Sequence, residues 1–182
     1  TLLIDEKTNY EHMKSLIKKY KPNKIFINKN IKSFKDYKKI FSFRNFLVYK
    51  RKIKLSLRIN KQLLLLVPTS GSTGSAKYVR LSKENLIYNT KSIVKYLKLS
   101  KNDTCITTLP MNYVYGLSVI NTHLYIGAKI ILNRSSVIEK NFWDLIVRHK
   151  VTNFAGVPYT YEILNKINFY NKNLKYIKFI TQ

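Results

Sequence analysis

Residues Thr69 to Lys77 read T-S-G-S-T-G-S-A-K and directly follow the apolar run Leu63 to Val67. A short apolar run before a Gly- and Ser-rich stretch predicts a buried strand that leads into a loop. Gly71 and Gly74 can adopt positive φ without steric cost, which lets backbone N–H groups approach an anion. The loop hydroxyls and the ammonium of Lys77 add further hydrogen-bond donors. The stretch therefore predicts a phosphate-binding loop, a feature of proteins that handle nucleotides.

Two better-known nucleotide-binding motifs do not match this loop. Walker A places Lys directly after its second Gly and follows it with Ser or Thr, whereas Ser75 and Ala76 precede Lys77 and Tyr78 follows it. The G-x-G-x-x-G pattern of dinucleotide-binding folds is also absent. The alternative is a solvated linker, which often has this composition. The preceding strand, the single Lys at the loop end and a helix signal soon afterwards favour the binding loop.

Three segments in order resemble the adenylate-forming superfamily, which includes acyl- and aryl-CoA synthetases, peptide-synthetase adenylation domains and luciferases. The loop is similar to the signature loop of that superfamily, with Ala76 in place of the usual Pro. Leu109 to Leu117, L-P-M-N-Y-V-Y-G-L, resembles its L-P-x-x-H-x-x-G-L segment, with Tyr113 in place of His. Phe154 to Tyr161, F-A-G-V-P-Y-T-Y, resembles its G-V-P-x-x-Y segment. The resemblance is clear from about Lys61 to Gln182.

The resemblance implies an α/β fold with a mostly parallel sheet flanked by helices, as an incomplete N-terminal domain of an adenylate-forming enzyme. Residues 1–60 would form an N-terminal lobe and connection, and residues 61–182 the lobe with the phosphate loop and acyl pocket. The first residue is not Met and the last residues resemble a strand end, so the sequence is expected to be a fragment. The adenine-, ribose- and Mg²⁺-binding segments and the mobile lid domain would lie beyond Gln182, which would leave the fragment alone inactive.

Hydrophobic periodicity independently predicts alternating strands and helices. A strand, a helix and a strand near the N-terminus predict a βαβ unit, followed by an irregular basic connection with short strands. After the loop, Ser82 is a predicted N-cap, and helices alternate with strands to the end. The expected strands are 2–4, 25–27, 46–49, 53–59, 63–67, 105–109, 129–132, 152–155 and 176–181, and the expected helices are 10–20, 83–97, 113–126, 141–150 and 159–167.

Ligands of parallel α/β sheets bind at the carboxyl ends of strands, and all three segments directly follow predicted strands. Alternation therefore predicts that they share one sheet edge. By resemblance, Thr73 and Lys77 would act in catalysis, and the β- and γ-phosphates of ATP would be held by Thr69, Ser70, Gly71, Ser72, Thr73, Gly74 and Lys77. The acyl pocket would be lined by Asn112, Tyr113, Tyr115, Gly116, Gly156, Val157, Pro158 and Tyr161, although ordinary helix packing is an equal alternative for Tyr115 and Tyr161.

The function implied is a ligase that activates a small carboxylic acid with ATP and Mg²⁺ as an acyl-adenylate. The acyl group would then pass to the thiol of CoA or of phosphopantetheine on an acyl or peptidyl carrier protein. The open alternatives are another nucleotide-phosphate-binding enzyme, such as a kinase, and a basic nucleic-acid-binding module.

Composition bears on these alternatives. The 34 Lys and Arg against 9 Asp and Glu give a net charge of +25, but the lysines are dispersed along the chain, so no specific nucleic-acid binding is expected. The single cysteine, Cys105, and three scattered histidines provide no zinc-ligand spacing, and no metal site is expected. The histidines are expected at the surface or core edge. No run is long enough to span a bilayer and no signal-peptide core is present, so a cytoplasmic protein is expected.

Overall fold

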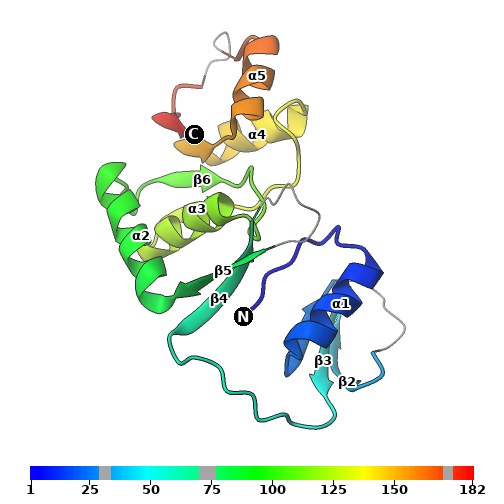
Figure 1. Cartoon of the computed structure of the whole chain (residues 1–182). Coiled ribbons are helices and arrows are strands. Elements are labelled where there is room, and N and C mark those ends of the chain that lie inside the picture. Colours follow the sequence, from blue (N-terminus) through cyan, green and yellow to red (C-terminus); the bar gives the residue numbers. More distant parts are fainter. Residues whose placement is uncertain (29–33, 70–76, 170–173) are drawn as a thin grey trace. The chain divides into compact units, whose positions relative to one another are not determined.

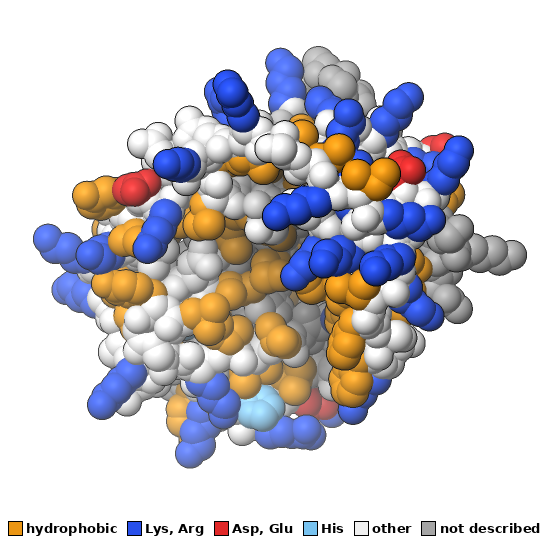
Figure 2. All heavy atoms as spheres, turned by 90° about the horizontal axis from the view of Figure 1, so that it is seen from below, with side chains coloured by type: hydrophobic (Ala, Val, Ile, Leu, Met, Phe, Trp, Pro, Cys, Tyr) orange, Lys and Arg blue, Asp and Glu red, His pale blue; other side chains and the backbone are white. Residues whose placement is uncertain are grey.

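The computed structural model describes residues 1–28, 34–69, 77–169 and 174–182. The chain divides into two compact units, one of Thr1–Leu3 with Gln62–Gln182 and one of Ile4–Lys61 (Figure 1). No helix in the described ranges is long and apolar enough to cross a membrane. On the face shown in Figure 2, Lys and Arg side chains are spread out among hydrophobic side chains, and few acidic side chains are visible.

The smaller unit is one helix on a three-stranded antiparallel sheet of order β1-β3-β2. The helix α1 (Tyr10–Tyr20) begins where the Asn9 side chain accepts a hydrogen bond from the His12 N–H at 2.8 Å. Its buried side chains are Met13 and Leu16. The core cluster contains Met13, Phe34, Tyr37 and Tyr49. The strands are β1 (Lys24–Ile27), β2 (Tyr37–Phe43) and β3 (Phe46–Arg51).

The predicted N-terminal βαβ unit is wrong. Leu2 forms a parallel bridge with Leu66 in the larger unit, while β1 pairs antiparallel with β3. The predicted irregular connection instead contains the β2–β3 hairpin, whose turn includes Arg44 at a φ of 51°. Residues 53–59, all within the described ranges, form no strand. Local alternation identified β1 and β3 but missed β2, and it carried no information on which strands pair, because pairing depends on tertiary contacts.

The larger unit contains a four-stranded parallel sheet of order β7-β6-β8-β9, as the alternating pattern predicts. The strands are β6 (Thr104–Ile106), β7 (Lys129–Ile131), β8 (Asn153–Ala155) and β9 (Phe179–Thr181). The helices between them are α3 (Val114–Tyr125), α4 (Lys140–His149) and α5 (Pro158–Lys166). The predicted α/β class with a mostly parallel, helix-flanked sheet is confirmed for this unit.

The main hydrophobic core lies where α4 and α5 contribute side chains to one sheet face. Ile106 and Phe154 project from neighbouring strands, and Phe142 and Ile146 come from α4. These four side chains are at most 2% exposed. The ring of Phe142 packs edge-on against Phe154, with ring centroids 5.6 Å apart. This packing holds the strand ends that carry two of the three sequence segments.

A second sheet carries the phosphate loop. The strand β4 (Leu63–Pro68) pairs antiparallel with β5 (Tyr78–Ser82), and α2 (Lys83–Tyr96) follows. Ser82 caps α2 as predicted, since its Oγ accepts a hydrogen bond from the Asn85 N–H at 3.1 Å. The strand β5 was not predicted. The loop therefore joins two hairpin strands of a separate sheet, and the prediction that all three segments share one sheet edge is wrong.

Asp103 lies at the amino-terminal side of the parallel sheet and is only 3% exposed. Its carboxylate accepts hydrogen bonds from the Ser100 N–H at 2.7 Å, the Ser100 Oγ at 3.0 Å, the Thr152 Oγ1 at 3.1 Å and the Lys178 Nζ at 2.7 Å. Burial alone would raise the pKa of Asp103, but the bonds from Lys178, Ser100 and Thr152 outweigh burial and lower it. The carboxylate thereby ties β6 to the segments that precede β8 and β9.

We expect Asp103→Ala to lower the free energy of unfolding by about 2 to 3 kcal/mol, because the hydrogen bonds to its buried carboxylate are lost, including the bond from the buried Thr152 hydroxyl. Urea unfolding followed by circular dichroism would measure this. Asp144→Ala is the matched control, since its bond to Lys140 at 2.7 Å is exposed and worth at most about 0.5 kcal/mol.

The pKa of Asp103 also predicts how this contribution depends on pH. Because the folded-state pKa lies below the ordinary 3.8, the stabilisation is present above that value and is lost as the pH falls through the folded-state pKa. The wild type and Asp103→Ala should therefore converge in stability only under strongly acidic conditions. An equal difference at every pH would contradict this assignment.

Candidate active site

The two ends of the phosphate loop are held together by hydrogen bonds. The Thr69 N–H donates to the Lys77 carbonyl oxygen at 2.9 Å, and the Thr69 Oγ1 donates to the same oxygen at 3.2 Å. Lys77 is exposed. The predicted phosphate-binding residues Ser70, Gly71, Ser72, Thr73 and Gly74 lie outside the described residues. The described part of the loop is thus its base, where hydrogen bonds between Thr69 and Lys77 extend the pairing of β4 and β5.

The other two segments begin at the carboxyl ends of the neighbouring strands β6 and β8. The Thr108 hydroxyl donates a hydrogen bond to the Ala155 carbonyl oxygen, which joins the two strand ends directly. On the other side of β6, the Asn133 N–H donates to the Thr107 Oγ1 at 2.9 Å. Threonine hydroxyls therefore link three strand ends at this edge.

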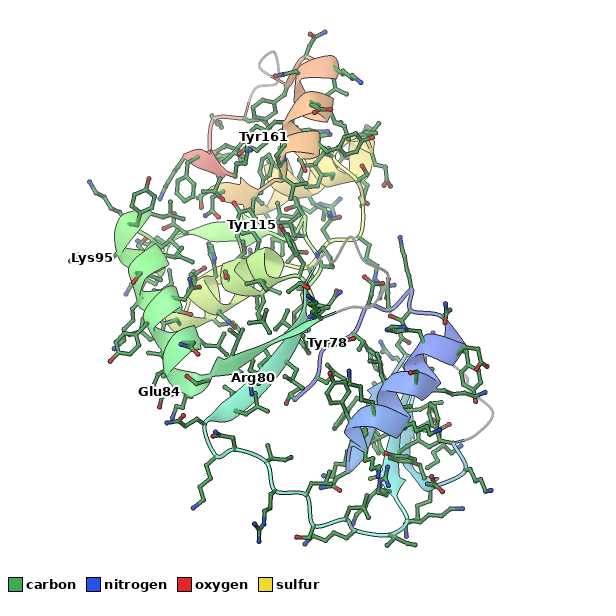
Figure 3. The ribbon with its side chains drawn as sticks, viewed as in Figure 1. Tyr78, Arg80, Glu84, Lys95, Tyr115 and Tyr161 are labelled. Atoms are coloured by element: carbon green, nitrogen blue, oxygen red, sulfur yellow. The ribbon has the colours of Figure 1, made fainter. Side chains whose placement is uncertain are left out.

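Tyr115 connects the first of these segments to β9. Its hydroxyl donates to the Thr181 Oγ1 at 2.8 Å, and the Gly156 N–H donates to the Thr181 carbonyl oxygen at 2.8 Å. Figure 3 shows Tyr115 on α3 and Tyr161 on α5, on two different helices of this unit. Thr181 thus receives one hydrogen bond from each of the two sequence segments. These segments follow β6 and β8, which are adjacent strands of the sheet.

Gly116 allows α3 to lie against the backbone of Leu109 and Pro110. A Cβ at this position would lie 2.3 Å from the Pro110 carbonyl oxygen and 2.9 Å from that of Leu109. The next residue, Leu117, packs with Leu65 and Val67 of β4. The close approach therefore fixes the start of α3 against both the strand end of β6 and the strand that leads into the phosphate loop.

The second segment starts α5 at Pro158, whose fixed φ suits the first helical position. The Val157 N–H donates to the Thr160 Oγ1 at 3.2 Å. A Cβ on Gly156 would lie 3.0 Å from the Thr160 side chain and 3.2 Å from Tyr161 Cε2. Gly156 and Tyr161 are therefore in close contact, and Tyr161 also lines a 410 Å³ cavity together with Leu164, Asn165, Phe169, Leu174, Ile177, Phe179 and Ile180.

The two tyrosines share an electrostatic environment. Burial raises the pKa of Tyr115, partly offset by its bond to Thr181. Burial also raises the pKa of Tyr161, with a further contribution from the nearby Tyr115. Both phenols are therefore neutral at physiological pH and can act as hydrogen-bond donors and acceptors, but not as anions.

The structure brings together some of the predicted acyl-pocket residues. Tyr115 and Gly156 both donate hydrogen bonds to Thr181, and Tyr161 lines a cavity with Phe179 and Ile180 of β9. Tyr113 is 40% exposed and Pro158 is also exposed, so the side chains of both predicted pocket residues face solvent. Asn112 and Val157 are half-buried, and Gly116 contacts backbone.

Sequence reasoning missed the threonines at the strand ends. Thr107, Thr108 and Thr181 each stand at the carboxyl end of a parallel strand, where ligands of such sheets bind. A hydroxyl residue near the carboxyl end of a predicted strand was the available signal. It became informative only once the strand order was known.

Cys105 and His123 are buried in the interior of the larger unit. Burial raises the pKa of the Cys105 thiol to about 12, so the thiol is protonated and inert. His123 lies in the core at 3% exposure, deeper than predicted, and burial lowers its pKa. Its Nδ1 is 2.8 Å from the Val119 carbonyl oxygen. Within the described ranges, no group of three or more His, Cys, Asp or Glu side chains could hold a metal ion.

Comparison with known proteins adds independent information. The indoleacetate–CoA ligase of Aromatoleum aromaticum is 33% identical over 102 residues, which is 56% of this chain and 20% of that enzyme. The O-succinylbenzoate coenzyme A synthetase of Bacillus subtilis in complex with AMP is 25% identical, with a TM-score of 0.57 over 67% of this chain and 31% of that one. The same enzyme in complex with ATP and magnesium is 26% identical, with a TM-score of 0.56 over 64% and 24%.

The chain spans about a fifth of the length of the curated relatives that it matches. The family model described as "AMP-binding enzyme" matches residues 6–180, nearly the whole chain. The match includes all three sequence segments and both compact units. The chain therefore belongs to the AMP-binding enzyme family.

Proposed function

We propose that the full-length protein is a cytoplasmic, ATP-dependent ligase that activates a carboxylic acid as an acyl-adenylate and passes the acyl group to a thiol. The observation that carries this proposal is the order and placement of the three segments. Two of them meet at Thr181 on the carboxyl edge of the parallel sheet, and Leu117 of the first packs on the strand that leads into the phosphate loop. The names of the relatives, which are CoA ligases, support it.

The phosphate loop would hold the β- and γ-phosphates of ATP. Its described ends suit this role, because the Thr69–Lys77 bond closes the base of the loop and Lys77 remains exposed beyond it. Hydroxyl, N–H and ammonium donors at such a loop stabilise charge that develops on departing pyrophosphate. Magnesium would neutralise phosphate charge when bound. We assign no magnesium ligand to the described residues, since they contain no suitable carboxylate cluster.

The acyl group of the substrate would lie near Tyr115, Gly156 and Tyr161. The neutral phenols and the glycine offer both apolar surface and hydrogen-bonding groups. Such a surface suits an acyl group that carries no charge of its own, because burying a charge without a partner is costly. The acceptor would be CoA or the phosphopantetheine of an acyl or peptidyl carrier protein. The 410 Å³ cavity beside Tyr161 is large enough for a small acyl group.

Carboxylate-dependent exchange of radioactive pyrophosphate into ATP tests the proposal. The full-length protein should catalyse this exchange with at least one member of a panel of short, medium-chain and aromatic acids, and not without acid. Adenylate formation is reversible, so exchange reports the first half-reaction alone. The release of ADP instead of AMP with every active acid would refute the ligase assignment and favour a kinase.

A further inference from the structure

The smaller unit has one packed and one open sheet face. The packed face carries Ile25, Tyr37 and Tyr49, which belong to the core cluster with α1. The strand register places alternate residues on the opposite face, where Phe26 and Phe41 both stand opposite Val48. On this open face lie Phe26, Phe41, Phe43 and Phe46, which are 74%, 57%, 58% and 55% exposed. We call these four residues the phenylalanine patch.

A row of lysines crosses the same face. Lys24 stands opposite Lys50, and Lys50 stands opposite Lys38, so three like charges occupy neighbouring positions on three adjacent strands. Like charges directly opposite one another destabilise a sheet. No ion pair to these lysines exists within the described ranges. The arrangement costs stability in the free protein and suits an anionic partner.

Basic groups lie on both sides of the phenylalanine patch. The lysine row is two residues along the strands from Phe26 and Val48, a separation of about 7 Å at the strand rise. At the other end, the Arg44 guanidinium lies over the Phe43 ring, 5.4 Å from its centroid. The face is therefore apolar in its centre and cationic at both ends.

The chain that follows β3 continues this character. From Lys52 to Asn60 it reads K-I-K-L-S-L-R-I-N, without helix or strand, and Ile53 and Ile59 are 75% and 62% exposed. The rings of the phenylalanine patch suit both nucleic-acid bases and lipid, but the exposed aliphatic side chains Ile53 and Ile59 offer no ring for stacking and partition readily into lipid.

We infer that the open face of the smaller unit, formed by the phenylalanine patch and the lysine row, binds the surface of an anionic lipid bilayer. The rings of the patch enter the boundary between headgroups and acyl chains, where apolar faces of peripheral proteins are buried by about 5 to 10 Å. The lysines remain at the level of the lipid phosphates because their long side chains extend toward the polar layer. This binding is independent of the adenylating activity.

Vesicle co-sedimentation of the full-length protein tests this inference. The chain should bind vesicles of about 30% phosphatidylserine in phosphatidylcholine and bind pure phosphatidylcholine weakly. The triple variant Lys24→Gln, Lys38→Gln, Lys50→Gln should bind anionic vesicles about 10- to 100-fold more weakly. The double variant Phe26→Ser, Phe41→Ser should lose a similar factor while retaining the response to lipid charge.

Matched variants of the larger unit separate a local surface from the net charge. Lys91→Gln, Lys95→Gln, Lys101→Gln removes the same charge from exposed positions, and Tyr88→Ser, Tyr96→Ser removes two exposed rings from α2. Both should bind vesicles nearly as well as wild type, with unchanged circular dichroism for all four variants. Equal losses from both lysine triples would overturn the inference. Tighter binding to single-stranded RNA than to vesicles, lost in the same face variants, would overturn it in favour of a nucleic-acid surface.

Discussion

Gly116→Ala is expected to lower the free energy of unfolding by about 3 kcal/mol or more, even though alanine favours helices over glycine by about 1 kcal/mol. The added Cβ would lie 2.3 Å from the Pro110 carbonyl oxygen, which is backbone and cannot rotate away. Either α3 or the Leu109–Pro110 segment must move, and both are tied to strands. Urea unfolding of the chain, followed by circular dichroism, measures the loss.

Gly127→Ala is the matched control for this prediction. A Cβ added at Gly127 would meet nothing within 4 Å, but the φ of +69° is unfavourable for alanine. The expected cost is about 1 kcal/mol, which reports backbone conformation alone. In the full-length enzyme, Gly116→Ala should also reduce adenylate formation, because the displaced helix carries Tyr115. A Gly116→Ala variant as stable as wild type would show that α3 does not depend on this contact.

Thr73→Ala in the full-length enzyme is expected to slow adenylate formation on the order of 10- to 1,000-fold, in line with the loss of one donor to a developing oxyanion. The effect should fall on the rate more than on ATP binding, because the contact strengthens as charge moves onto departing pyrophosphate. Lys77→Ala should have a smaller effect, since the exposed ammonium is screened by solvent. Pyrophosphate exchange at saturating acid measures both variants.

The second half-reaction provides the control for these loop variants. Transfer of a pre-formed acyl-adenylate to the thiol should be nearly unchanged in Thr73→Ala and Lys77→Ala, because pyrophosphate has already left. Equal loss in both half-reactions, with an unchanged circular dichroism spectrum, would mean that the loop has a structural role and does not bind phosphate. The two loop predictions thus distinguish phosphate binding from general loop stability.

Local sequence patterns were sufficient for the parallel sheet of the larger unit and for the ends of two of its helices. Ser82 caps α2 because a hydroxyl at that position satisfies a free helix N–H, a preference that needs no tertiary context. Gly127 ends α3 with positive φ for a similarly local reason. Regular alternation of strand and helix predicted the parallel sheet, since right-handed crossovers leave few alternatives. The three segments, met in order, were enough to indicate the family.

Strand pairing was decided by the tertiary structure. Nothing local distinguishes Tyr78–Ser82 as the hairpin partner of β4, or assigns Leu2 to Leu66 rather than to β1, because each choice depends on which apolar faces can be buried together. Strand order also decides the role of Thr181. It can accept hydrogen bonds from both Tyr115 and Gly156 only because β9 lies beside β8. Sequence identified the chemical groups of this protein, and the order of its strands decided which of them meet.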